Sequence, residues 1–149
     1  MEYIEEYLQF VKNQRQNVDD IINSCVDEIK DEIRQTIKAR WLRGESVNGG
    51  KITNKATGGG YRSLSYEHLK LQKNPSAGGS PDLTLSGSLG DKITTELTDD
   101  GNHEIKSLDA KYEEIGNKYG FEEFGLTADE MIYFMKLLEE RINNKLNNY

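Results

Sequence analysis

Few residues of this chain combine the type and the spacing that chemistry requires. The sequence of 149 residues contains two histidines and one cysteine. Neither His68 nor His103 has a histidine, cysteine or carboxylate at the spacing of a metal-binding signature, so we predict no metal site. Cys25 lies on an apolar stripe with Ile22 and Ile29. A buried free thiol is expected there, because a nucleophile needs a nearby base and some exposure.

The remaining candidates for catalysis are incomplete motifs. Gly58-Gly59-Gly60 lacks the Gly-Lys-Ser/Thr ending of a phosphate-binding loop, and Ser86 lacks the first glycine of a nucleophile elbow. Three carboxylate pairs are adjacent in sequence, so their side chains diverge and solvated charge is expected: Asp99-Asp100, Glu113-Glu114 and Glu122-Glu123. We therefore predict no catalytic residue and no cofactor. A small hydrolase using Ser86 or a carboxylate pair is the least favoured alternative.

The composition is that of one small domain over residues 1–149. Its single cysteine excludes a disulfide scaffold, and its hydrophobic fraction of 35% predicts a thin core or one completed by a partner. No apolar run approaches the roughly 18 residues that cross a bilayer. The first six residues include three glutamates and no basic residue, whereas a signal peptide begins with basic residues. We therefore expect neither membrane insertion nor secretion.

Charge and glycine are unevenly distributed along the chain. Residues 1–42 contain six basic and nine acidic side chains, residues 43–82 six and three, and residues 83–149 seven and fourteen. The middle segment also holds eight of the 14 glycines and both prolines. This pattern predicts a flexible, basic inserted arm over residues 43–82, and connections of that length are commonly functional or disordered.

We expect the basic arm to dock on an acidic neighbouring subunit. Contact with single-stranded nucleic acid or with passing DNA, and simple solvation, are the less favoured alternatives. A net charge of −7 argues against a protein that wraps nucleic acid with its whole surface. The residues predicted at the subunit interface are Lys51, Lys55, Tyr61, Arg62, Leu64, Lys70, Lys73, Leu85 and Leu89.

The arm is flanked by a helix and by a mixed region. Apolar residues recur at positions 4, 8, 11, 18, 22, 25, 29, 33, 37 and 41, with Arg15 as the one polar interruption. They predict a long amphipathic helix over residues 1–42, and part of its stripe is expected to face another chain. Residues 83–126 predict a short helix, a β-hairpin and a turn region. The preferred hairpin has the loop Asp100-Gly101-Asn102 and pairs Leu97 with Ile105; the alternative pairs Thr98 with His103.

The last segment, residues 127–148, carries the clearest local signal. Thr127 and Glu130 form a capping box, and Leu126 and Met131 a hydrophobic staple. The stripe expected to pack in the core or in an interface comprises Met131, Phe134, Met135, Leu138, Ile142 and Leu146. Together these elements predict an α+β fold, with a long N-terminal and a C-terminal helix packed on a small antiparallel sheet.

An ordered series of short motifs spans residues 40 to 148. They are Tyr61-Arg62-Ser63-Leu64-Ser65 with Lys70 and Lys73, Leu83 with Ser86-Gly87-Ser88-Leu89-Gly90-Asp91-Lys92-Ile93, Ala110-Lys111-Tyr112-Glu113-Glu114-Ile115-Gly116, and Phe124-Gly125-Leu126-Thr127. Their order after a long N-terminal helix resembles a family of tailed-bacteriophage virion morphogenesis proteins. These are the tail-completion or neck proteins that close the head-to-tail joint.

The resemblance implies a structural virion protein without enzymatic chemistry. Members of the family act as rings of identical subunits, most commonly six. The expected partners are therefore identical subunits and neighbouring neck, connector or tail proteins, with DNA passing through the lumen and no membrane. The expected location is the virion neck or tail, assembled in the bacterial host cytoplasm. The alternative is a non-enzymatic helical adaptor that forms a dimer or heterodimer.

Overall fold

The computed structural model describes residues 2–55, 72–74, 83 and 87–147. Its helices and strands are α1 (Glu2–Leu42), α3 (Ser88–Asp91), β1 (Ile93–Leu97), β2 (His103–Ser107), α4 (Tyr112–Tyr119), the 3-10 helix η2 (Phe121–Phe124) and α5 (Ala128–Asn147). The predicted α+β class is confirmed, and the fold is mostly helical. In the described part of the chain, no helix is both long and apolar enough to cross a membrane.

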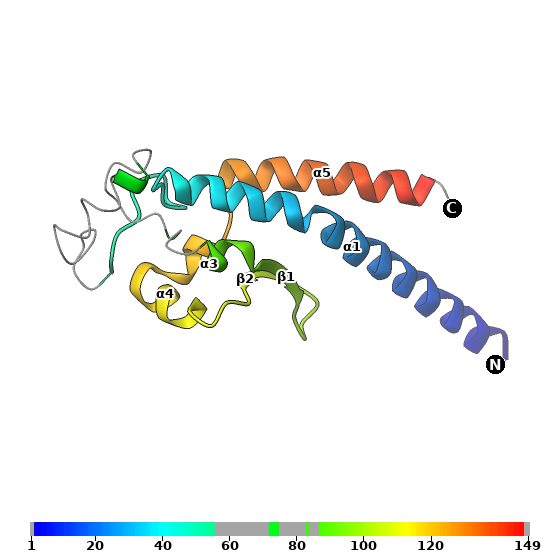
Figure 1. The fold of residues 1–149 in the computed structure, drawn as a ribbon. Coiled ribbons are helices and arrows are strands. Elements are labelled where there is room, and N and C mark those ends of the chain that lie inside the picture. The colour runs from blue at the N-terminus through cyan, green and yellow to red at the C-terminus, as the bar shows by residue number, and fades with distance from the viewer. Residues whose placement is uncertain (1, 56–71, 75–82, 84–86, 148–149) are drawn as a thin grey trace.

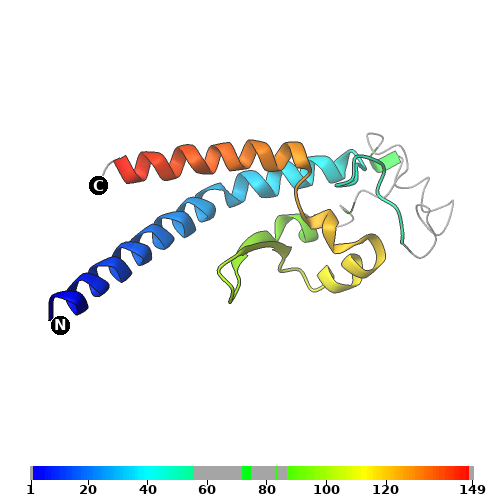
Figure 2. The same cartoon turned by 180° about the vertical axis from the view of Figure 1, so that it is seen from behind.

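The C-terminal half of α1 is the central element of the fold. Helix α5 runs along one side of it, and α3 and the hairpin lie on the other (Figure 1). The two views show that the N-terminal half of α1 diverges from α5 and continues away from the body (Figure 2). The molecule is therefore a compact body with one projecting helix.

The core forms where α1 meets the other elements. Its buried apolar residues are Ile29, Ile33, Ile37, Trp41, Ile52, Leu83, Leu89, Ile93, Phe124 and Phe134. The Trp41 ring meets the Phe124 ring edge to face at a centroid distance of 5.2 Å, and Tyr112 meets Phe124 at 4.7 Å. Aromatic pairs in this geometry stabilise beyond their buried area. On α1 this cluster begins at Ile29, and further buried apolar side chains at Ile21, Cys25 and Val26 extend the covered part of the helix toward its N-terminus but not to residues 3–20.

The first part of the predicted flexible arm belongs to the body. Ile52 is 1% exposed and lies in the core, and Asn54 is buried as well. The Ile52 amide donates to the Gly44 carbonyl at 2.9 Å, and the Lys55 amide donates to the Lys118 carbonyl at 2.7 Å. Residues 43–55 therefore differ from the prediction of an arm beginning at residue 43. The remainder of the predicted arm lies largely outside the described residues.

The hairpin follows neither of the two predicted registers. Leu97 pairs with His103 and Thr95 with Ile105. The Gly101 amide donates to the Thr98 carbonyl at 3.0 Å, and the Thr98 amide donates to the Asn102 carbonyl at 2.8 Å. The loop thus has three residues, as preferred, but it runs from 99 to 101 rather than from 100 to 102. Gly101, with φ of 85°, occupies the last position of this loop, where a left-handed backbone is required.

The N-terminus of α5 confirms the capping box. The Glu130 amide donates to Thr127 Oγ1 at 3.1 Å, and Glu130 Oε1 accepts from the Thr127 amide at 2.9 Å. Phe134 on the predicted stripe is buried in the core, whereas Met131 and Met135 are 44% and 56% exposed. Helix α5 packs mainly against α1, so part of the apolar surface of α5 stays exposed.

Candidate interaction surface

The residues considered for chemistry have structural partners in the fold. Cys25 is completely buried, as predicted, and His103 Nε2 lies 2.9 Å from Asn23 Oδ1 between the hairpin and α1. Within the described ranges, no group of three or more histidine, cysteine or acidic side chains is arranged to hold a metal ion. Ser86, His68 and the glycines at 58–60 lie outside the described residues.

The carboxylate pairs have separate environments. Hydrogen bonds from Thr98 and then from Asn102 lower the pKa of Asp100, which caps the hairpin turn. A hydrogen bond from Lys118 lowers the pKa of Glu114 within α4. Glu123 differs from the predicted solvated carboxylate, because it is 3% exposed. Its oxygens accept from Ser46 Oγ and from the Val47 amide at 3.1 Å.

The predicted interface residues are split between surface, core and undescribed segments. Lys51 and Lys73 are exposed, and Lys55 pairs with Glu122 at 3.0 Å within the same chain. Leu89 is buried in the core of its own chain, which removes it from the surface available to a neighbour. Five further residues lie outside the described residues: Tyr61, Arg62, Leu64, Lys70 and Leu85. The described residues therefore bring no compact basic cluster together.

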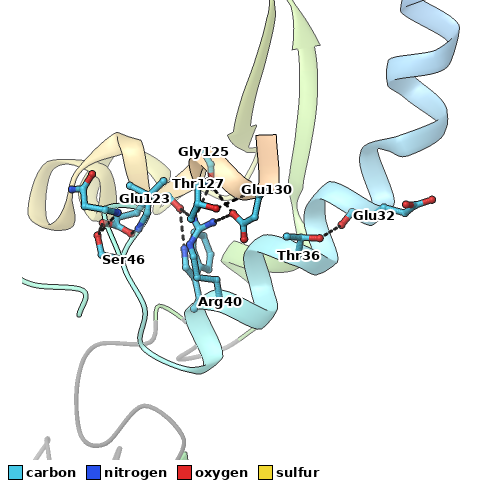
Figure 3. A network of polar contacts seen from close by, with 11 residues as sticks. Glu32, Thr36, Arg40, Ser46, Glu123, Gly125, Thr127 and Glu130 are labelled. Carbon is cyan, nitrogen blue, oxygen red and sulfur yellow. Dashed lines mark hydrogen bonds and ion pairs between the residues drawn. The ribbon is translucent and has the colours of Figure 1, made fainter. Parts of the chain in front are cut away.

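A buried polar network fixes the C-terminal end of α1 (Figure 3). Arg40 is 2% exposed; its Nη1 donates to Glu130 Oε1, and its Nη2 donates to the Glu123 and Gly125 carbonyls, each at 2.9 Å. Trp41 Nε1 donates to the same Glu123 carbonyl at 3.0 Å. Buried charges require such partners, so the network aligns α1 with η2 and with the start of α5.

In the described part of the chain, a run of exposed apolar side chains lies on the N-terminal half of α1. Tyr3, Ile4, Tyr7, Leu8 and Phe10 are between 51% and 84% exposed, and Val18 is 40% exposed. Two side-chain hydrogen bonds in this segment stay inside the helix, from Gln9 to Asn13 and from Gln16 to Asp20. We call residues 3–18 of α1 the α1 tip. Contiguous exposed apolar side chains of this kind mark interaction surfaces in soluble proteins.

The apolar face of the α1 tip continues the buried face of the same helix. At about 100° per residue, Ile4, Leu8 and Val11 fall on the side that Cys25 and Ile29 present to the core. Exposure changes from 40% at Val18 to 9% at Ile21. The last polar contacts of α5 with α1 reach Ser24 and Glu28 from Lys145. The stripe thus extends well beyond the element that covers it.

A second, smaller apolar patch lies on α5. Met131, Ile132, Tyr133 and Met135 are each 44% to 58% exposed. Three of them, at positions 131, 132 and 135, share one helix face by their spacing. The sequence predicts that Met131 and Met135 pack in the core or in an interface. Because both are exposed in the single chain, they are available to an interface.

Sequence reasoning anticipated the projecting helix and missed the buried network. The apolar period continues to Ile4 in a chain with few other apolar residues, which predicted that part of the stripe faces another chain. No local signal marks Arg40 or Glu123 as buried, because their partners lie more than 70 residues away in sequence. Comparison of the chain with protein-family models, curated proteins and solved structures finds no significant match.

Proposed function

We propose that this chain is a non-catalytic structural subunit that assembles with copies of itself into a ring at the head-to-tail joint of a tailed bacteriophage. The single observation that carries self-assembly is the α1 tip, whose large apolar side chains are more than half exposed from Tyr3 to Leu8. The hydrophobic fraction of the chain is only 35%, yet six large apolar residues are exposed on the α1 tip. Exposed apolar surface of this kind favours a partner that covers it.

The place in a virion is supported by the order of the sequence motifs. Several motif residues hold structural positions in the fold: Phe124 packs on Trp41, and Thr127 caps α5. A Cβ on Gly116 would lie 2.1 Å from Phe121 Cε1, so the absence of a side chain at Gly116 makes room for the Phe121 ring between α4 and η2. These residues build the junction between α1, η2 and α5, which fits motifs retained for the fold of a subunit.

Ring closure requires a heterologous contact, in which one surface of a subunit meets a different surface of the next. Residues 43–82 have a sequence net charge of +3 and residues 83–149 of −7, so attraction between these segments of neighbouring subunits would favour such a contact. The exposed apolar patch on α5 offers a further surface for a neighbour.

Light scattering coupled to size exclusion, followed by native mass spectrometry, tests the proposal on the purified chain. We expect a single closed species with a fixed number of copies, most commonly six, and a ring in electron micrographs. A discrete dimer at all concentrations would favour the helical adaptor instead, since that reading needs only the α1 stripe. A species that stays monomeric would contradict both.

A charge reversal tests the contribution of the basic segment. Arg62→Glu with Lys70→Glu should lower the fraction of ring and make it more sensitive to salt, because opposite charges steer and hold the contact. Lys111→Glu, an exposed position outside both the α5 patch and the α1 tip, is the control and should leave the ring unchanged. An unchanged ring in the double variant would remove the arm from the assembly mechanism.

A further inference from the structure

We infer that the α1 tip pairs with the α1 tip of a second copy of this chain as a short antiparallel coiled coil. The contact is isologous, since the same residues meet on both sides, and it goes beyond the heterologous contact that closes a ring. An assembly that uses both contacts contains an even number of copies.

The spacing of the apolar residues fits a coiled-coil seam. Ile4, Leu8, Val11, Arg15 and Val18 alternate in steps of four and three, the heptad pattern of positions d and a. Tyr7 and Phe10 widen the seam on one side and are 65% and 58% exposed. A second helix of the same sequence would cover this face with side chains of matching size.

Charge selects the orientation and the register. In an antiparallel pair, each a residue meets a d residue, and e residues face e residues. Aligning Leu8 with Val11 of the second copy places Glu5 opposite Lys12. By the two-fold symmetry, Lys12 also lies opposite the Glu5 of the second copy. Both positions are exposed in the single chain, and within its described part neither side chain has an ion pair that would compete. Arg15 then faces Ile4 at the open end of the paired segment, where its guanidinium reaches solvent.

The other alignments place like charges together. A parallel pair puts Arg15 directly against Arg15 in the seam. Moving the antiparallel pair by one heptad in one direction sets Lys12 against Lys12 and Glu5 against Asp19, and in the other direction sets Glu5 against Glu5. Like charges across a helix interface are unfavourable, so one register remains.

A second copy also fits the acidic character of the helix. Residues 2–20 contain five acidic and two basic side chains, which opposes binding to an anionic lipid surface. Self-pairing in the stated register uses one of those basic residues, Lys12, twice. The occupant is therefore another copy rather than a membrane.

Sedimentation equilibrium of the full chain and its variants tests the pairing. Leu8→Glu should weaken the α1 contact at least a hundredfold, and Lys12→Glu at least tenfold. The double variant Glu5→Lys with Lys12→Glu should restore most of the affinity, because the charges are exchanged and not lost. Asn13→Glu, on the polar face, is the control and should change nothing. Unchanged circular dichroism and thermal midpoints would show that each variant folds.

Cysteine cross-linking reports the orientation directly. In a mixture of Leu8→Cys and Val11→Cys chains, we expect the mixed 8-to-11 disulfide to dominate under mild oxidation. Cys25 is completely buried and gives no competing background. Predominant 8-to-8 and 11-to-11 products would overturn the antiparallel arrangement.

The outcomes separate this inference from the proposed function. If the Leu8→Glu variant formed rings with the same number of subunits as the wild type, the α1 pairing would be wrong and the proposed ring would still hold. Dimers that dissociate in Leu8→Glu, in a protein that never forms rings, would support the pairing and overturn the ring. Failure of the exchanged-charge variant to restore association would assign the α1 tip to a different chain and contradict the inference.

Discussion

Arg40 and Glu130 meet through one oxygen atom that also caps a helix. Glu130 Oε1 accepts from Arg40 Nη1 and, at 2.9 Å, from the amide of Thr127. The capping box of α5 is therefore joined to a buried cation near the end of α1, 90 residues away in sequence. A local helix-start signal and a tertiary ion pair share one carboxylate, so they are expected to form and break together.

Replacing the buried cation should destabilise the protein strongly. Arg40→Met removes the partner of Glu130 and leaves the Glu123 and Gly125 carbonyls with fewer donors, which we expect to cost about 3 kcal/mol. Urea unfolding measures the change in the free energy of unfolding. Arg43→Met is the matched control; Arg43 is half exposed and forms an ion pair with Glu45 at the surface, so its loss should cost less than about 0.5 kcal/mol. Equal effects of the two substitutions would contradict a structural role for the network.

Shortening Ile52 should show that residues 43–55 belong to the body. Ile52→Ala removes a side chain that is 1% exposed, and cavities of this kind cost about 3 kcal/mol. Lys51→Ala, one residue earlier and exposed, should change the stability by less than about 0.5 kcal/mol. The thermal midpoint of each variant is sufficient to distinguish them. If Ile52→Ala had no effect, this segment would behave as part of the arm after all.

The stability of the hairpin loop should depend on which residue replaces Gly101. Gly101→Ala forces a side chain into a backbone with φ of 85°, which we expect to cost about 1 kcal/mol. Gly101→Asn is the control, because asparagine tolerates the left-handed region better than alanine. Chemical denaturation of both variants provides the comparison. If Gly101→Asn were less stable than Gly101→Ala, the loop would have a different conformation.

Acid should weaken the junction between α3 and α4 through Asp109. A hydrogen bond from the Ser88 hydroxyl, and then one from the Lys111 amide at 2.8 Å, hold the pKa of Asp109 below its ordinary value of 3.8. Because the folded pKa is lowered, this stabilisation is complete above that ordinary value. It is lost as the pH falls through the lowered pKa.

Urea unfolding at a series of pH values measures that contribution. Asp109→Asn should be less stable than the wild type at neutral pH, and the two stability curves should converge at the acid end. Glu5→Gln, on the exposed α1 tip, should follow the wild-type curve when measured at a concentration where the chain is monomeric. Curves for wild type and Asp109→Asn that keep the same separation at every pH would show that ionisation of Asp109 is not linked to folding.

The sequence predicts those elements whose signals are local. The apolar period of α1 and the capping box at Thr127 are complete within one or two helical turns, and both are present in the structure. The signal for a three-residue hairpin loop is also local, and the structure has a loop of that length. Its placement differs by one residue because glycine and asparagine, which both adopt left-handed backbone, are adjacent at 101 and 102.

The missed features depend on distant partners. Ile52 reads as part of a polar, glycine-rich segment, and its burial comes from contacts with α1 and with the residues that follow α4. The sequence predicts Glu123 to be one of two adjacent surface carboxylates. In the structure it is buried because the loop after α1 brings the Ser46 hydroxyl and the Val47 amide to its carboxylate. For the interaction surface, the sequence predicted that part of the α1 stripe is unpaired, while its extent required knowing where α5 ends.

The projecting half of α1 acts as a lever. At about 1.5 Å per residue, residues 2–20 extend about 28 Å from the body, so a tilt of 10° at the base displaces the far end by about 5 Å, close to one turn of a partner helix. The direction of that lever is set at its other end, by the packing of Ile29 and Ile33 and by the Arg40 network. Small changes deep in the body would therefore be amplified into displacements of several ångströms at the α1 tip, and if that tip is a contact surface, some mutations that alter assembly should lie far from it.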